Sequence, residues 1–134
     1  MRKALVLGSN GQLGTDVILH SPETWEVIPH LRSEWDVTND GGLEYLSGIN
    51  PDVIINTTAF HNVDECEKNP ELARSVNRDA VEGLAIIAES IGAILVHIST
   101  DYVFGNSGSE NYEPFTESSV PSPMNIYGKS KLEG

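Results

Sequence analysis

Three short stretches of the chain are almost continuously apolar, and they constrain the fold more than any other feature. They cover residues 4–7, 53–55 and 93–98, and a weaker stretch of the same kind covers residues 25–29. A strand with one face in water alternates apolar and polar side chains, whereas a strand of a parallel sheet is covered on both faces and is apolar along its length. The sequence therefore predicts parallel strands with helices on both faces of the sheet.

Helical periodicity fills the longest interval between these stretches. The pattern begins at Pro70 and ends at Gly92, a glycine at the position that typically follows a helix. Its apolar side chains recur every three or four residues and predict one buried face. These side chains are Leu72, Val76, Ala80, Leu84, Ile87 and Ile91.

Two shorter helices are expected in the other intervals. Residues 12–20 predict the first, and residues 38–48 predict the second, with Thr38 or Asn39 as its cap. Strands and helices thus alternate, and right-handed crossovers between parallel strands then give an α/β fold with a doubly wound parallel sheet, a Rossmann fold. In such a sheet the ligand crevice lies beyond the carboxyl ends of the strands.

A long segment near the end of the chain lacks any periodicity. Residues 105–123 are rich in Gly, Ser, Asn, Glu and Pro, and a new helical pattern starts near Asn125. Loops of this length in compact domains are typically functional, as lids or parts of substrate sites. We therefore predict a functional loop followed by a helix.

Composition limits the cellular setting and the partners. The chain has 134 residues, enough for one domain, and its 20 acidic and 8 basic residues give a formal charge of −12. This charge repels a phosphate backbone, so nucleic acid is excluded as a partner. Cys66 is the only cysteine, and no signal peptide or membrane span is apparent. We expect a cytoplasmic protein that does not bind membranes.

A glycine-rich loop follows the first predicted strand and opens the first predicted helix. Gly8, Gly11 and Gly14 are spaced Gly-x-x-Gly-x-x-Gly, which departs from the usual Gly-x-Gly-x-x-Gly of dinucleotide sites. Such glycines allow a tight turn and a close approach of the backbone to a pyrophosphate at the helix N-terminus. The alternative is a plain strand-to-helix turn, but the strand–loop–helix context favours a cofactor site.

The end of the second predicted strand bears on the choice of cofactor. An acidic residue that binds the adenosine ribose is expected there, but the sequence reads His30-Leu31-Arg32. An arginine suits a ribose 2′-phosphate better than a free 2′-hydroxyl, so NADP(H) is favoured and NAD(H) is the alternative. Arg32 could also be a solvated surface residue, and Asp36 could reach the ribose or the adenine instead.

A second chemical signal is a tyrosine and a lysine four residues apart. Tyr127 and Lys131 lie at the start of the last predicted helix, on one face. A phenol can give its proton to a carbonyl oxygen during hydride transfer if an ammonium group stabilises the resulting anion. Ser99 and Thr100 follow a predicted strand on the crevice side, where a hydroxyl could polarise the same carbonyl.

Other polar residues favour structural interpretations. His61 and Cys66 lie in an acidic segment that lacks the paired spacings of a zinc site, so we predict no metal. The roles of these two residues are left open. His97 interrupts an apolar run, and we expect it to be a hydrogen-bonded core histidine.

Together these segments resemble the extended short-chain dehydrogenase/reductase family, and within it the dTDP-4-dehydrorhamnose reductases. The resemblance extends over essentially the whole chain. It rests on the glycine loop, Asp-Val-Thr at 36–38, Asn-Thr-Thr-Ala at 56–59, Asn77, Ser-Thr-Asp-Tyr-Val-Phe at 99–104, and Pro-x-Asn-x-Tyr-Gly-Lys-Ser-Lys at 123–131.

The resemblance implies a role for each matching residue. Thr100, Tyr127 and Lys131 would be catalytic, with Tyr127 as proton donor and Lys131 also binding the nicotinamide ribose. Asn77 would support the active site, although a place on the helix surface is the alternative. The implied cofactor-binding residues are Gly8, Asn10, Gly11, Gln12, Leu13, Gly14, Arg32, Asp36, Val37, Thr58 and Ala59, with Tyr127 and Lys131, and the implied substrate-binding residues are Tyr102, Val103 and Phe104.

The resemblance also implies a reaction. Hydride would pass from NADPH to the C4 keto carbon of a dTDP-linked 6-deoxyhexulose, a nucleotide-sugar, giving dTDP-L-rhamnose. Two alternatives remain. One is another nucleotide-sugar epimerase or dehydratase, and the other is a non-catalytic cofactor-binding subunit like the regulatory subunit of methionine adenosyltransferase. Thr100, Tyr127 and Lys131 favour an enzyme, because a binding subunit needs no proton donor.

The family pattern continues well beyond its Tyr–Lys helix, whereas this sequence ends at Gly134. We therefore expect residues 1–134 to form an NAD(P)-binding Rossmann domain that is incomplete at its C-terminal side and lacks the substrate-binding lobe. The 134 residues alone are expected to be weakly active or inactive. An exposed sheet edge would favour pairing with a second copy as a homodimer.

Overall fold

The computed structural model describes residues 1–105 and 114–134, and its centre is a sheet of parallel strands. The strands are β1 (Arg2–Leu7), β2 (Trp25–His30), β3 (Val53–Asn56) and β4 (Ile94–His97), in the order β2-β1-β3-β4. The apolar stretches therefore predicted each strand correctly to within two residues at either end. The predicted parallel α/β sheet is confirmed.

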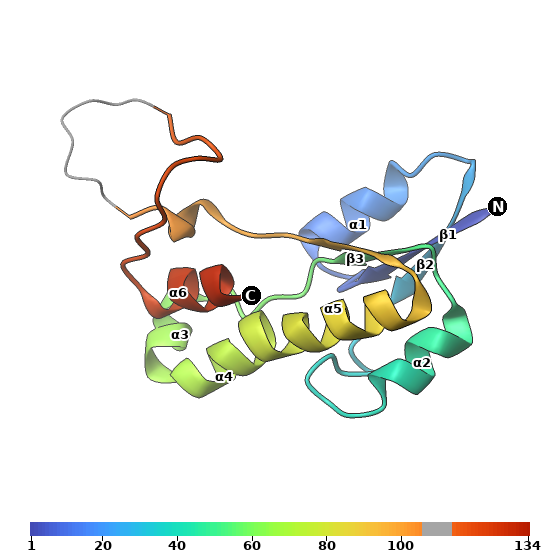
Figure 1. Cartoon of the computed structure of the whole chain (residues 1–134), viewed down its shortest axis with the longest axis horizontal. Helices are drawn as coiled ribbons and strands as arrows, with labels where there is room; N and C mark the ends of the chain where they lie inside the picture. The colour runs from blue at the N-terminus through green and yellow to red at the C-terminus, as the bar shows by residue number, and fades with distance from the viewer. Residues whose placement is uncertain (106–113) are drawn as a thin grey trace.

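Helices cover the two faces of this sheet as a doubly wound fold requires. Helix α1 (Gln12–Leu19) lies on one side, and α2 (Gly42–Ile49) and α5 (Ala80–Ile91) lie on the other (Figure 1). The chain moves outward from β1 to β2 and then crosses back to β3 on the far side of β1. The strand order thus reverses between β1 and β3, and the ligand crevice of such sheets lies beyond the strand ends at this point.

The main core lies between the sheet and the pair α2 and α5. Its buried members come from strands β1 and β3 and from both helices: Leu5, Leu7, Leu46, Ile54, Leu84 and Ala88. Each buried leucine or isoleucine side chain contributes about 1.5–3 kcal/mol relative to its exposed state. This packing holds the strands in place and so fixes the positions of their carboxyl ends, where the candidate site lies.

The long helical segment after Pro70 is interrupted. Helix α4 (Pro70–Arg74) passes into the π-helical turn η1 (Ser75–Asp79) before α5, which ends at Gly92 with a φ of 72°. The predicted start and end are confirmed, but the predicted buried face is wrong near the start. Leu72 is 44% exposed, whereas Ala73 and Asn77 are fully buried. A π turn fits an extra residue into one turn and so shifts which residues face inward.

The predicted start of the second helix is also wrong. Thr38 does not cap α2, because its backbone N–H and its hydroxyl both donate to Oδ1 of Asp36. The indole N–H of Trp35 donates to the carbonyl oxygens of Asn39 and Asp40. These bonds hold the segment in turns, and α2 begins only after Gly41, at a φ of 90°.

The last helix begins where the sequence predicted. Helix α6 (Ile126–Glu133) follows Asn125, whose Oδ1 accepts a 2.7 Å hydrogen bond from the backbone N–H of Gly128. It packs against α3 (Val63–Lys68), α4 and η1. The short helix η2 (Asp101–Val103) precedes the predicted loop, of which residues 106–113 lie outside the described part and 114–123 contain only turns and extended chain. None of the helices described is long and apolar enough to cross a membrane.

The face of β4 on the side of α1 remains open. Ile94 is 64% exposed, and Val96 and Ile98 are 41% and 37% exposed. In the described part of the chain β4 also ends the strand order, so this apolar face and the backbone groups along the edge of β4 would be open to a second copy.

We expect concentration-dependent association through β4. Ile94→Lys should weaken it at least tenfold, because a charge replaces the most exposed apolar side chain on the strand, and sedimentation velocity would measure the change. Leu43→Lys, on the opposite side of the sheet and 53% exposed, is the matched control. A chain that stays monomeric at all concentrations would contradict this expectation.

The packing of α1 on the glycine loop yields a stability prediction. A Cβ on Gly14 would lie 2.3 Å from the carbonyl oxygen of Gly8, so Gly14→Ala must separate helix and loop. We expect a loss of about 1–3 kcal/mol in the free energy of unfolding, measured by urea denaturation.

Gly83→Ala is the control for this experiment. Gly83 lies inside α5 with no atom within 4 Å of an added Cβ, so the change should stabilise the chain by about 0.5–1 kcal/mol. Equal effects at the two glycines would rule out the close contact at Gly14.

Candidate active site at the strand ends

A first cavity lies at the carboxyl ends of β1 and β2. It has a volume of about 140 Å³. Seven of the predicted cofactor-binding residues line it, namely Gly8, Asn10, Arg32, Asp36, Val37, Thr58 and Ala59, together with His30, Trp35, Phe60 and Val76. The structure thus places Arg32, Asp36, Val37 and Ala59, which the sequence assigned to the adenosine end of a dinucleotide, around one cavity with Gly8 of the glycine loop.

A second cavity of about 300 Å³ shares Thr58 and Ala59 with the first. Its lining contains the remaining predicted cofactor residues, Gly11, Gln12, Leu13, Gly14, Tyr127 and Lys131, together with Thr57, His61, Ile98 and Ser99. The two cavities therefore run from the end of β2, past the glycine loop, to helix α6. An elongated ligand with one part in each cavity would suit this arrangement.

The glycine loop between the cavities has the geometry of an anion seat. Gly8 has a φ of 80°, which glycine adopts without strain, and its carbonyl oxygen accepts a 3.0 Å bond from the N–H of Gly11. Gly11 is also the cap residue of α1, and no side chain caps that helix. The first N–H groups of a helix have no partner within it, so they can bind the oxygens of a pyrophosphate.

At the rim of the first cavity, Arg32 and Asp36 form an ion pair. Nε of Arg32 lies 2.6 Å from Oδ2 of Asp36, and the arginine side chain is 80% exposed. Burial alone would raise the pKa of Asp36, but hydrogen bonds from Thr38 and Arg32 outweigh it and lower this pKa. The guanidinium is thus held at the cavity by a carboxylate that competes with any phosphate for it.

The end of β2, where a ribose-binding carboxylate was expected, contains a buried histidine instead. Nε2 of His30 lies 2.8 Å from the carbonyl oxygen of Trp35, so this nitrogen carries the proton and donates it. Nδ1 then accepts from the hydroxyl of Tyr45, also at 2.8 Å. His30 is therefore a structural residue that supports the wall of the first cavity.

Lys131 lies in the second cavity and is only 3% exposed. Its Nζ donates to the carbonyl oxygen of Ile98 at 2.6 Å and lies 3.1 Å from Nε2 of His97. Burial lowers the pKa of Lys131 to about 8. Burial and the nearby charge of Lys131 lower the pKa of His97 to about 4, so this imidazole stays neutral at physiological pH.

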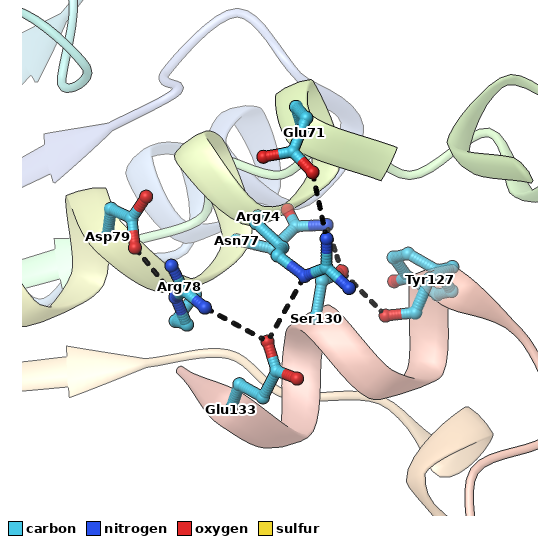
Figure 2. A network of polar contacts seen from close by, with 8 residues as sticks. All are labelled: Glu71, Arg74, Asn77, Arg78, Asp79, Tyr127, Ser130 and Glu133. Carbon is cyan, nitrogen blue, oxygen red and sulfur yellow. Dashed lines mark hydrogen bonds and ion pairs between the residues drawn. The ribbon is translucent and has the colours of Figure 1, made fainter. Parts of the chain in front are cut away.

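Asn77 holds the helix that carries Tyr127 and Lys131. Its side chain points from the π turn toward Ser130 (Figure 2), and its Nδ2 donates to Oγ of Ser130 at 3.0 Å. Ser130 in turn donates to the carbonyl oxygen of Tyr127. The amide of Asn77 also donates to the backbone carbonyl of Phe60 and accepts from its N–H. Asn77 is fully buried, so the alternative expectation, a polar residue on the helix surface, is wrong.

An ion-pair cluster extends this attachment at the end of α6. Arg74 and Arg78 lie 3.9 Å and 3.7 Å from Oε2 of Glu133 (Figure 2). These partly exposed pairs add modestly to the buried bonds of Asn77.

The predicted substrate-binding residues lie beside the second cavity. Tyr102 packs edge-on against Tyr127, with ring centroids 5.5 Å apart. Tyr102 and Phe104 line a third hollow of about 390 Å³ with Asn125, whereas the side chain of Val103 is buried and does not line it.

Ser99 lines the second cavity, but Thr100 does not. The hydroxyl of Thr100 accepts from the backbone N–H of Tyr102 at 3.3 Å and donates to Asp101, so it caps η2. The structure therefore brings Tyr127 and Lys131 together with the glycine loop and places Thr100 at the edge of this group.

Sequence reasoning underestimated two residues of the site. His97 was expected to be a hydrogen-bonded core histidine; it is hydrogen-bonded but only half-buried, and one of its partners is Lys131. Asn56 appeared only as part of a motif, yet it lies 3.2 Å from the other ring nitrogen of His97. The available signal was a polar residue at the carboxyl end of each of two adjacent strands.

Cys66 and His61 differ in their surroundings. Cys66 is fully buried, burial raises the pKa of its thiol, and the thiol donates to the carbonyl oxygen of Phe60. It is therefore structural, whereas His61 lines the second cavity. In the part of the chain that the structure describes, no three His, Cys, Asp or Glu side chains are grouped so as to hold a metal ion.

Comparison with known proteins identifies relatives along the whole chain. A dTDP-4-dehydrorhamnose reductase of Salmonella typhimurium is 44% identical over 135 residues, which cover 97% of this chain and 44% of the relative. The beta subunit of methionine adenosyltransferase 2 from Xenopus laevis is 36% identical over 99% of this chain and 41% of the relative. The chain thus spans about half the length of the curated relatives it matches.

Solved structures agree with this result. The crystal structure of a dTDP-4-dehydrorhamnose reductase from Bacillus anthracis, in complex with NADP, superposes with a TM-score of 0.90 at 34% identity, over 99% of this chain and 48% of that one. A family model described as the RmlD substrate binding domain matches residues 1–134. Because this match extends over all the residues, the chain belongs to the RmlD substrate binding domain family.

Proposed function

We propose that this chain binds NADPH across the two adjoining cavities and serves in the reduction of a dTDP-linked 4-keto-6-deoxy sugar. The observation that carries the proposal is that the glycine loop, Tyr127 and Lys131 line one cavity, which shares Thr58 and Ala59 with the cavity of Arg32. The NADP complex of the Bacillus anthracis relative supports the choice of cofactor.

Each end of the site would have a separate task. The glycine loop and the N-terminus of α1 would hold the pyrophosphate, and Arg32 would face the ribose phosphate. Bound NADPH would supply the hydride. Tyr127 would give its proton to the keto oxygen, and the Lys131 ammonium would stabilise the phenolate that remains. Thr100, at the start of η2, would bind the same keto oxygen once its hydroxyl turns from Asp101 toward the substrate, with Tyr102 and Phe104 bordering the sugar.

The 134 residues would bind the cofactor and contain the proton donor, but they would not form the complete substrate site. The family description names substrate binding, whereas the residues matched here line cavities suited to a dinucleotide. The relatives are about twice as long, and we propose that their additional segment grips the nucleotide-sugar. Residues 1–134 alone would then bind NADPH with weak or no turnover.

Calorimetry tests the cofactor site. NADPH should bind the wild-type chain, and Gly11→Val should abolish binding, because a Cβ at Gly11 would already lie 3.2 Å from the carbonyl oxygen of Gly8 and the branched side chain would occupy the pyrophosphate seat. Gly83→Val, in an open position on α5, is the control. Equal NADPH binding by the wild type and Gly11→Val would reject the proposed pyrophosphate seat.

Two substitutions at the ion pair test cofactor choice. Arg32→Ala should reduce the ratio of NADPH to NADH affinity about tenfold, since it removes a charge-assisted contact to the 2′-phosphate. Asp36→Asn should raise the ratio, because the competing carboxylate charge is lost and Arg32 is released. An unchanged ratio in both variants would show that Arg32 is only a surface residue.

The chemistry can be measured in a chimera in which these 134 residues replace the matching part of the Salmonella typhimurium relative. NADPH oxidation with the keto sugar should fall by more than a hundredfold in Tyr127→Phe, which loses the proton donor. The rate should also fall as the pH rises through about 8, because the pKa of Lys131 is lowered to that value and its ammonium charge is lost above it.

The beta-subunit relative from Xenopus laevis supports a second candidate function, a cofactor-binding subunit without catalysis. In that case NADPH would bind with the same dependence on Gly11, but the chimera would reduce no sugar and Tyr127→Phe would change nothing. The two assays therefore separate the candidates.

A further inference from the structure

The side-chain amide of Asn56 has only one orientation that satisfies its neighbours. Its Oδ1 accepts both the backbone N–H of Thr58, at 3.0 Å, and the hydroxyl of Thr58, at 2.6 Å. A backbone N–H can only donate, so the atom facing it must be the oxygen. Asn56 is 1% exposed, so both ends of its amide need partners within the protein. Its NH₂ group therefore points the other way, at Nδ1 of His97, 3.2 Å away.

This orientation determines which nitrogen of His97 carries the ring proton. A donor faces Nδ1, so Nδ1 must be the acceptor, and the proton of the neutral ring is on Nε2. Nε2 lies 3.1 Å from Nζ of Lys131. An N–H can bond to a neutral amine, which has a lone pair, but not to an ammonium, which has only donors.

When Lys131 is charged, one of the two contacts made by His97, to Asn56 or to Lys131, therefore sets two hydrogen-bond donors against each other. Either the Nε2–H of His97 faces the ammonium, or the ring proton moves to Nδ1 and faces the NH₂ group of Asn56. Only the carbonyl oxygen of Ile98 accepts from Lys131 in both protonation states. The neutral amine, by contrast, satisfies every partner.

We propose that Asn56 and His97 are positioning residues for Lys131: Asn56 fixes the ring proton of His97 on Nε2, and this N–H donates to the neutral amine of Lys131. The pair thereby stabilises the neutral amine relative to the ammonium, so that the Lys131 ammonium, after stabilising the phenolate of Tyr127, can return a proton to it and remain as the bonded neutral amine. This inference deepens the proposed function, because it concerns the lysine of the proposed Tyr127–Lys131 pair.

The stabilisation of the neutral Lys131 amine is consistent with the titratable groups around it. The titratable groups that line the cavity with it are Tyr127 on α6 and His61 from the loop after β3, and His97 contacts it from β4. Glu133, on α6, is paired with Arg74 and Arg78. Among the residues that the structure describes, no carboxylate forms an ion pair with Lys131, so the lowered pKa of its amine is consistent with burial and with the proposed hydrogen bond.

Nuclear magnetic resonance tests the proposal without cofactor or substrate. Above about pH 8, where the amine of Lys131 is neutral, long-range ¹⁵N spectra of the wild-type chain should show His97 protonated on Nε2. In Asn56→Asp, one carboxylate oxygen still accepts from Thr58 while the other accepts from His97, so the ring proton should move to Nδ1. This tautomer change is a signature that general loosening of the fold would not produce.

Titration of the Lys131 Cε signal, assigned with Lys131→Arg, supplies the second readout. His97→Gln places a carbonyl oxygen near the position of Nε2, so the ammonium gains an acceptor and the midpoint should rise by about one pH unit or more. Asn56→Asp should raise it as well, by the tautomer change and by its charge.

The outcomes divide clearly. An Nε2–H tautomer in the wild type together with a raised Lys131 midpoint in His97→Gln supports the proposal. An Nδ1–H tautomer in the wild type above about pH 8 overturns it, even if no variant folds, and so does an unchanged midpoint in a folded His97→Gln chain. Because neither measurement uses NADPH or sugar, failure of the reductase proposal would leave both results interpretable.

Discussion

The whole site depends on the burial of residues 4–7 of β1 between two parallel neighbours. Leu5, Val6 and Leu7 have no exposed surface, so the strand cannot shift without exposing core side chains. The loop that follows is consequently held from both sides. The hydroxyl of Ser9 donates to the carbonyl oxygen of His30 at the end of β2, and the hydroxyl of Thr57 donates to that of Leu7 from the end of β3. The glycine loop is therefore preorganised by the sheet.

Helix α6 reaches this loop through polar contacts more than through apolar packing. Its buried residues are Gly128, Ser130 and Lys131, of which two are polar. A buried polar group needs a partner to offset the loss of water, and these two find theirs in Asn77 and in the carbonyl oxygen of Ile98. The π turn is what aims Asn77 at α6. A turn of this kind in the middle of a long helix is thus tied to the placement of Tyr127.

The electrostatics of the site differ from those of the chain as a whole. The chain carries a formal charge of −12, yet the glycine loop offers an anion backbone N–H groups, and the rim of the first cavity carries Arg32. Lys131 is buried beside the neutral ring of His97, and burial lowers the pKa of its amine to about 8. A site of this kind suits a ligand that brings its own negative charge.

The sequence by itself determined the strands, their alternation with helices and the glycine loop, because apolar runs, helix-ending glycines such as Gly92 and helix-starting residues such as Asn125 act over a few neighbouring positions. It also predicted that Tyr127 and Lys131 share a helix face. Only the tertiary structure decided the network around the lysine. Asn56 and His97 are 41 residues apart and meet because the parallel register pairs them across β3 and β4, and Lys131 reaches them from a helix 34 residues further on. Contacts of that range arise from packing of the whole fold, so local sequence patterns do not reveal them.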